Sequence, residues 1–210
     1  MMARSKREIP RHYLTSTIEV GSLVTFLAEQ NADRPPDRRV LPVAALLEAA
    51  ALGVGEVPEM NGCFLEGAFH PSKAVHLGVA IALRQGGLVA PVIRDLERLS
   101  PDEAMATMQD LPRRARAGRV RSSKVGEATL TVTSLGDLGV DAVLGVIYPP
   151  EVALVGFGTI AQRRWAVDVL VGAGPTVTAS LAADHRVSDG HLGARFPRAI
   201  GRHLHDVEGP

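Results

Sequence analysis

The 210-residue sequence contains a single cysteine, Cys63. A single cysteine excludes an intrachain disulfide and every zinc site built from several cysteines, and it is typical of a protein of the reducing cytoplasm. The sequence also has no excess of positive or negative charge, because its 23 lysines and arginines are balanced by 23 aspartates and glutamates. This balance argues against non-specific binding to nucleic acid as the main role.

Long apolar runs are missing as well. The longest, residues 41–54, is interrupted by Pro42 and Glu48 and is too short to span a bilayer. The first eight residues are charged and lack the apolar core of a signal peptide. Hydrophobic residues still make up 46% of the chain, which is enough to form the core of one domain. We therefore expect a single domain, residues 1–210, located in the cytoplasm and without contact to a membrane.

Patterns for metal or dinucleotide binding are not found. The histidines are scattered, and His203 and His205 point apart on a helix. The stretch 156–158, Gly-Phe-Gly, lacks the third glycine and the following helix of a dinucleotide-binding fold. We expect no metal and no bound dinucleotide.

Periodicity and capping residues predict alternating strands and helices, and hence an α/β domain. A turn at 66–67 is expected to join the second and third strands as a hairpin. Expected strands cover 13–20, 63–65, 75–83, 88–93, 129–133, 152–157, 165–170 and 176–183, and expected helices begin at 22 and cover 43–54, 100–117 and 189–205.

The candidate chemistry follows the apolar strand at 176–183. His185 comes at the end of that strand, where a side chain is held rigidly and an imidazole can be kept neutral. Asp189 lies where the last helix should begin, so its carboxylate can simply cap that helix. On spacing alone, a structural and a catalytic histidine are supported equally.

Residues 185–190, His-Arg-Val-Ser-Asp-Gly, resemble the His-x-x-x-Asp-Gly signature of the dihydrolipoamide acyltransferase component of 2-oxo acid dehydrogenase complexes, which chloramphenicol acetyltransferase shares. Further stretches resemble the same catalytic domain in the same order, over nearly the whole chain: 5–15, 58–62, 76–81, 87–95, 130–136 and 149–154. The resemblance implies a chloramphenicol-acetyltransferase-like fold, a two-layer α/β sandwich with a mixed β-sheet, and a homotrimer.

The resemblance also implies roles for individual residues. In the family a histidine takes a proton from one thiol carrier, whose sulfur then attacks the thioester of the other carrier, which makes His185 the general base. A hydroxyl stabilises the oxyanion, and alignment of residues 130–136 gives that role to Thr133, with Ser134 beside it. Neighbouring strand residues point to opposite faces, so only one can serve, and we prefer Thr133. Ordinary strand positions for both are the alternative.

Two more positions follow from the resemblance. The family's residue at Asp189 is structural and pairs with an arginine from a basic helix that lies upstream of the segment where this sequence starts. Arg4, Arg7 and Arg195 are the candidate substitutes for that arginine. His12 belongs to a stretch that lines the family's substrate channel.

The implied substrates are two thiol carriers, acyl-coenzyme A and a lipoyl group, which meet in a channel between subunits. The sequence shows neither a lipoyl domain nor a peripheral-subunit-binding domain, so we expect a lipoylated carrier protein to bring the lipoyl group. Other 2-oxo acid dehydrogenase subunits are further candidate partners. Two alternatives stay open: a coenzyme A-dependent acyltransferase with a non-lipoyl acceptor, and a catalytically idle trimeric scaffold. The acyl group and the residues that hold the carriers are not identified by the sequence.

Overall fold

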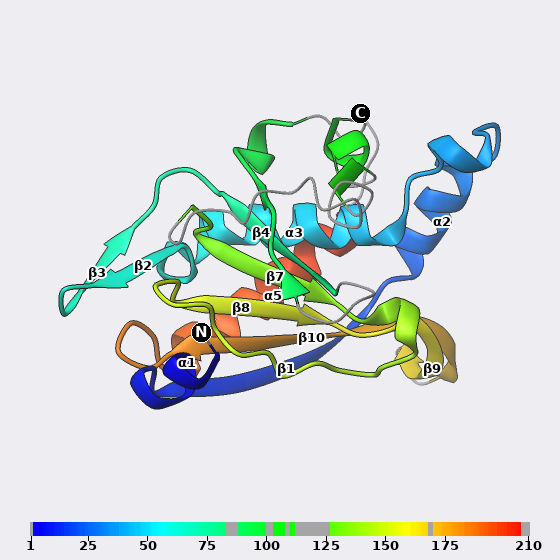
Figure 1. The fold of residues 1–210 in the computed structure, drawn as a ribbon. Helices are drawn as coiled ribbons and strands as arrows, with labels where there is room; N and C mark the ends of the chain where they lie inside the picture. The colour runs from blue at the N-terminus through cyan, green and yellow to red at the C-terminus, as the bar shows by residue number, and fades with distance from the viewer. Residues whose placement is uncertain are drawn as a thin grey trace.

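The computed structural model describes residues 2–82, 88–99, 103–107, 110–111, 127–167 and 170–206 (Figure 1). Much of the helix expected at 100–117 lies outside these residues, although 103–107 and 110–111 are helical. Within the described residues, no helix combines the length and the apolar character that crossing a bilayer requires.

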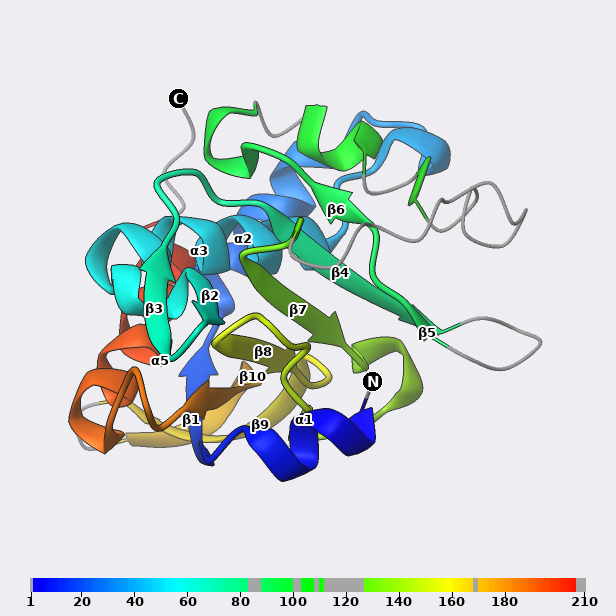
Figure 2. The same ribbon diagram turned by 60° about the vertical axis from the view of Figure 1, so that its left-hand side comes forward.

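Eight strands form one mixed sheet. Its order is β1-β10-β8-β7-β4-β5, with β6 paired to β4 and β9 paired to β10. The strand β7 runs parallel to both neighbours, β4 and β8, which Figure 2 shows side by side, and the other pairs are antiparallel. The bounds are β1 (Arg11–Glu19), β4 (Leu77–Ala82), β5 (Leu88–Val89), β6 (Val92–Ile93), β7 (Leu130–Ser134), β8 (Ala153–Phe157), β9 (Ala161–Val167) and β10 (Leu170–Asp184).

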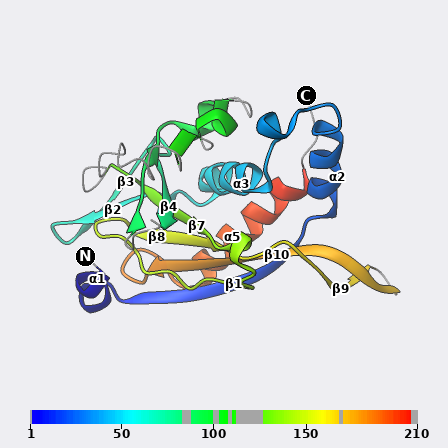
Figure 3. The ribbon, with the colours of Figure 1, turned by 45° about the vertical axis from the view of Figure 1, so that its right-hand side comes forward.

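Helices α2 (Gly21–Gln30), α3 (Pro42–Glu56) and α5 (Gly190–His205) lie together on one side of the strands (Figure 3). The core between the layers includes the fully buried Leu47, Leu181 and Phe196. α3 approaches α5 closely at Gly53, where an added Cβ would lie 3.2 Å from the Phe196 ring. The two-layer sandwich with a mixed sheet is therefore confirmed.

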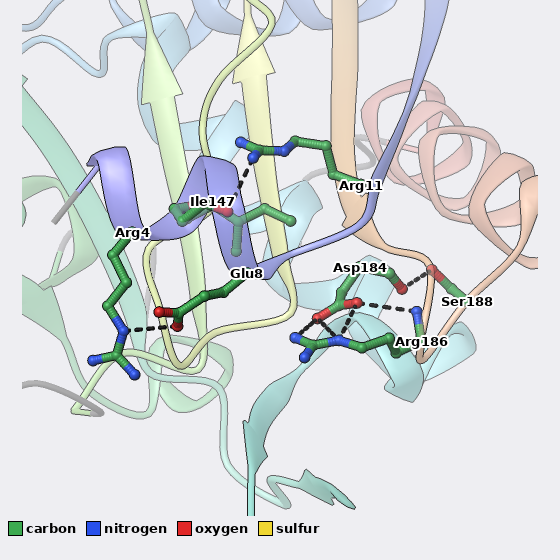
Figure 4. A network of polar contacts seen from close by, with 8 residues as sticks. Arg4, Glu8, Arg11, Ile147, Asp184, Arg186 and Ser188 are labelled. Atoms are coloured by element: carbon green, nitrogen blue, oxygen red, sulfur yellow. Dashed lines mark hydrogen bonds and ion pairs between the residues drawn. The ribbon is translucent and has the colours of Figure 1, made fainter. Parts of the chain in front are cut away.

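A short helix, α1 (Met2–Glu8), precedes β1 and is held by buried contacts. The Ser5 hydroxyl donates to the carbonyl of Ile147 at 2.6 Å, and the Arg11 guanidinium donates to the carbonyl of Ser5 at 2.9 Å (Figure 4). These bonds fix the path by which the chain enters β1.

The predicted hairpin was correct in its turn and wrong in its second strand. Around Glu66 and Gly67, β2 (Gly62–Leu65) pairs with β3 (Ala68–Pro71), and this small hairpin projects away from the main sheet (Figure 1). The expected partner, residues 75–83, instead supplies β4 of the main sheet. Leu77 and Gly78 are buried there beside β7, a central place that suits an apolar strand.

Two other strand predictions were wrong in extent. The strand expected at 88–93 is divided into β5 and β6 around Pro91, which has no N–H to donate to the ladder. The strand expected at 165–170 contains the end of β9 and the start of β10. β10 is 15 residues long and continues through Gly172, Gly174 and Pro175, so it joins the end of one expected strand to the strand expected at 176–183.

On the face away from the helices, residues 140–146 run directly against β8. At Gly156 an added Cβ would lie 2.4 Å from Val143 Cγ1 and 2.5 Å from the Val143 carbonyl oxygen. Ser180, on β10, donates its hydroxyl to the same carbonyl. Glycine at position 156 is therefore required by the close approach of this segment.

We expect Gly156→Ala to lower the free energy of unfolding by about 1–3 kcal/mol, because the methyl group forces the segment at Val143 off the sheet. Urea denaturation followed by circular dichroism measures this change. Gly172→Ala on β10 is the control, since no heavy atom lies within 4 Å of its added Cβ. Equal stability of the two variants would contradict the packing described.

Candidate active site

His185 is the residue immediately after β10. Its backbone N–H donates to the carbonyl of Pro10 at 2.7 Å, which extends the pairing of β10 with β1 by one residue. The side chain itself is exposed in the single chain. The histidine thus has a fixed backbone and an imidazole that is open to a reactant.

Asp184, the last residue of β10, is fully buried and carries a dense set of hydrogen bonds (Figure 4). Arg186 donates to its carboxylate from Nε at 2.9 Å, from Nη2 at 2.6 Å and from the backbone N–H at 3.0 Å. The guanidinium also lies 3.8 Å above the centre of the Phe64 ring. The hydrogen bond to Asp184 raises the pKa of Arg186, so the guanidinium keeps its charge beside this carboxylate.

The loop that follows turns back on Asp184. The backbone N–H groups of Val187 and Ser188 both donate to the Asp184 carbonyl at 3.0 Å. α5 then begins, with Asp189 as its N-cap, and the Leu192 N–H donates to the Asp189 carboxylate at 2.8 Å. This bond lowers the pKa of Asp189. The predicted helix cap is confirmed.

None of the candidate arginines pairs with Asp189 in the described part of the chain. Arg4 pairs with Glu8 at 2.8 Å, and Arg195 donates to the carbonyl of Glu56 at 3.2 Å. Asp189 therefore satisfies its carboxylate at the helix terminus, and the loop around His185 is held by Asp184 and Arg186 instead. Sequence reasoning missed this pair, although an aspartate that ends an apolar strand two residues before an arginine is a detectable signal.

His12, on β1, lies beside His185. The two ring centroids are 5.1 Å apart and the rings meet edge to face at 65°. His12 Nε2 is 3.0 Å from the hydroxyl oxygen of the buried Ser188. Burial lowers the pKa of His12, and the neighbouring His185 lowers it further. His12 therefore belongs to the same cluster as the candidate general base.

Thr133 does not meet His185 within one chain. On β7 it lies opposite Gly156 of β8, and Gly156 lies opposite Ser180 of β10. His185 follows Ser180 by five residues, which corresponds to roughly 16 Å along the strand, with two strand spacings of about 5 Å across. Ser134 is adjacent on β7 and is no closer to a shared site. Both side chains are partly buried.

A buried acid that the sequence did not single out lies just before β8. Glu151 is buried, with 6% of its surface exposed, and this burial raises its pKa to about 8. Its presence also raises the pKa values of Cys63 and Tyr148, for which burial is the larger cause. Glu151 is accordingly neutral at pH 7. Among the described residues, no group of three or more histidine, cysteine, aspartate or glutamate side chains could hold a metal ion.

The raised pKa of Glu151 makes stability depend on pH. Between its ordinary value of 4.5 and about 8, the folded chain holds a proton that the unfolded chain has released. The free energy of unfolding should therefore fall as pH rises through this window, by at most about 1.4 kcal/mol per pH unit. Glu151→Gln should remove this contribution, which urea unfolding between pH 5 and pH 8 measures. Glu29→Gln, exposed on α2, should leave the slope intact; a slope retained in Glu151→Gln would contradict the assignment.

Comparison with known proteins identifies relatives by sequence. The family model for the 2-oxoacid dehydrogenases acyltransferase (catalytic domain) matches residues 1–209. The dihydrolipoyllysine-residue acetyltransferase component of the pyruvate dehydrogenase complex from Rhizobium meliloti is 28% identical over 99% of this chain and 47% of its own length. The corresponding protein from Acholeplasma laidlawii is 30% identical over 93% of this chain and 36% of its own length. The chain spans about half the length, or less, of these curated relatives.

Solved structures agree. The dihydrolipoamide acetyltransferase of Azotobacter vinelandii, studied for the roles of a serine, a histidine and an asparagine in its catalytic mechanism, superposes with a TM-score of 0.92 at 28% identity and covers 98% of this chain and 86% of that chain. Chloramphenicol acetyltransferase superposes with a TM-score of 0.63 at 14% identity, over 97% of this chain and 92% of that chain, which shows a shared fold alone. Because the family model covers almost every residue, the chain belongs to the family of 2-oxoacid dehydrogenase acyltransferase catalytic domains.

Proposed function

We propose that this domain transfers an acyl group between the thiols of a dihydrolipoyl group and coenzyme A, with His185 as the general base. The observation that carries the proposal is the rigid placement of an exposed imidazole at the end of β10, in a chain that matches the acyltransferase family throughout. The imidazole of His185 is accessible to a thiol, while the residues on either side of it in the chain fix its backbone.

Spacing along the sequence supports the same assignment. In the Azotobacter enzyme the asparagine follows the histidine by four positions, as Asp189 follows His185 here. The serine of that enzyme precedes its histidine by the same number of positions that separates Thr133 from His185. We therefore assign Thr133 as the hydroxyl that stabilises the oxyanion, and Asp189 as the residue that caps α5 behind the histidine.

The chemistry requires one proton acceptor and one hydrogen-bond donor. Neutral His185 takes the proton of the incoming thiol, and the sulfur attacks the carbonyl carbon of the thioester. The oxyanion that forms accepts a hydrogen bond from the hydroxyl of Thr133. When the tetrahedral intermediate collapses, the carbon–sulfur bond to the first carrier breaks and His185 returns the proton to the departing thiolate. No metal takes part in this scheme.

We further propose that two copies of the chain complete each site. Within one chain His185 is separated from Thr133 by roughly 16 Å along the sheet and two strand spacings, which is too far for both to contact one carbonyl. A homotrimer, in which His185 of one subunit faces Thr133 of the next, removes this difficulty. A matched relative was solved as the cubic core of a pyruvate dehydrogenase complex, so assembly of this domain type has a precedent.

The two carriers reach the site from outside these 210 residues. Coenzyme A arrives as a free acyl thioester, and the lipoyl group is carried on a separate lipoylated segment, with other 2-oxo acid dehydrogenase subunits as associated partners. We place the protein in the cytoplasm, in agreement with its single cysteine. The competing function is an idle trimeric scaffold, which is favoured by the lack of an arginine partner for Asp189 in the described residues.

We expect His185→Ala to reduce the rate of acyl transfer by about 10²–10⁴-fold, because the general base is removed. The assay follows the formation of acyl-dihydrolipoamide from acetyl- or succinyl-coenzyme A and dihydrolipoamide, separated by chromatography, because the total number of thiols does not change in the reaction. His70→Ala, on the exposed strand β3, should retain the native rate. Turnover that survives His185→Ala would overturn the mechanism, and absence of turnover in the native protein would favour the scaffold.

A site formed by His185 of one subunit and Thr133 of the next predicts that two inactive variants, each lacking one of these residues, complement each other. Thr133→Ala alone should lose about 10²–10³-fold in rate, which is typical for the loss of one oxyanion donor. Co-expression of Thr133→Ala with His185→Ala should restore up to about one quarter of native activity, because that share of the interfaces, over all trimers formed by random mixing, pairs an intact His185 with an intact Thr133. Each variant expressed alone is the control. A mixture no more active than the controls would argue against a site shared between subunits.

A further inference from the structure

Two imidazoles that come from different strands lie together at the candidate site. His12 is on β1, directly opposite Ala183 of β10, and His185 follows two residues later. Their rings meet edge to face with centroids 5.1 Å apart. The acyl transfer proposed above uses only His185, so the role of His12 has to be found in its other contacts.

His12 is connected to the loop that carries His185. Its Nε2 lies 3.0 Å from Ser188 Oγ, and the same hydroxyl lies 3.3 Å from the carbonyl of Asp184. The hydroxyl has a single hydrogen, which the Asp184 carbonyl can accept; Ser188 then accepts the Nε2–H of His12. A continuous line of hydrogen bonds therefore runs from β1 through Ser188 to the end of β10.

The surroundings of His12 suit a fixed, neutral ring. Gly193 of α5 leaves the space for the ring, since a Cβ there would lie 2.8 Å from His12 Cε1. His12 Nδ1 is buried and has no hydrogen-bond partner in the described part of the structure, so a proton on this atom would lack an acceptor. The ring is consequently held in one orientation, with Nε2 toward Ser188.

We propose that His12 is a positioning residue for His185: its ring packs against the edge of the catalytic imidazole, and its bond to Ser188 fixes the loop on which that imidazole sits. This inference rests on the proposed function of His185. The hydrogen bond between His12 and Ser188 restrains this loop from β1. Asp189 does not restrain it through an arginine, because its carboxylate caps the N-terminus of α5.

Three charged or titratable groups face His12 from the elements packed around it. His185 opposes its protonation, whereas the carboxylates of Asp189 on α5 and Asp184 on β10 favour it. The negative charge of Asp184 is already paired with Arg186, and the effect of burial on His12 is larger than the attraction of the two carboxylates for its proton. The pKa of His12 is lowered on balance, which favours the neutral form of this ring beside the proposed general base.

A pair of substitutions separates the hydrogen bond from the packing of the ring. His12→Phe keeps an aromatic ring against His185 and removes the donor to Ser188, and we expect kcat to fall about 10–100-fold with KM changed less than about threefold. His12→Gln places an amide N–H near the position of Nε2, so it should recover kcat to within about threefold of native. Thermal unfolding verifies that both variants are folded. Full activity of His12→Phe, or equal loss in both variants, would overturn the proposal.

A second measurement does not depend on activity and therefore separates failure of this inference from failure of the proposed function. Histidine ring resonances, followed by NMR against pH, give the pKa of His12 in the native chain and in His185→Gln. We expect this pKa to rise in His185→Gln, because a neighbouring positive charge is removed. His70→Gln is the control and should leave it unchanged. An unchanged pKa of His12 in His185→Gln would show that the two rings do not interact, even in a protein without acyltransferase activity.

Discussion

The buried carboxylate of Asp184 is the constraint on which the arrangement of the site depends. A carboxylate taken out of water is strongly unfavourable unless it is paired and hydrogen-bonded. Here Arg186 meets that requirement with its guanidinium and with its own backbone N–H, and the Asp184 carbonyl accepts two further N–H groups from the same loop. Because His185 lies between the two paired residues, its backbone cannot leave the end of β10 without exposing the Asp184 carboxylate to water or separating it from Arg186.

The sheet determines which parts of the site one chain can supply. β7 carries Thr133 near the middle of the strands, whereas His185 lies beyond the end of β10, two strands away. Strand spacing and rise are fixed by backbone geometry, so no rotamer change brings these side chains together. The exposed ring of His185 and the distance to Thr133 are two consequences of one architecture, and the proposal of a site shared between subunits rests on both.

The sequence predicted the elements and residues that depend on local signals. Capping at Asp189, the turn at Glu66 and Gly67, and the apolar strands β7 and β8 follow from spacing and composition, and the structure has them where they were expected. The partner of β2 was not predictable, because 68–71 carries little apolar pattern and the stronger run at 77–82 belongs to the centre of the sheet. Likewise the length of β10 depends on its pairing with β9, which overrides the glycines and proline in its first half.

The site shows the same division between local and long-range causes. His185 was identifiable from its signature, but the residues that hold it come from β1 and from the strand end, and their contacts exist only after β1 and β10 have paired. The resemblance implied an arginine partner for Asp189 that would restrain this loop, and Arg4, Arg7 and Arg195 were the candidate substitutes. In this chain the restraint instead comes from hydrogen bonds of the buried Asp184 and Ser188. Bonds to buried groups are screened by salt far less than an exposed ion pair, so this way of holding the histidine is the less sensitive to ionic strength.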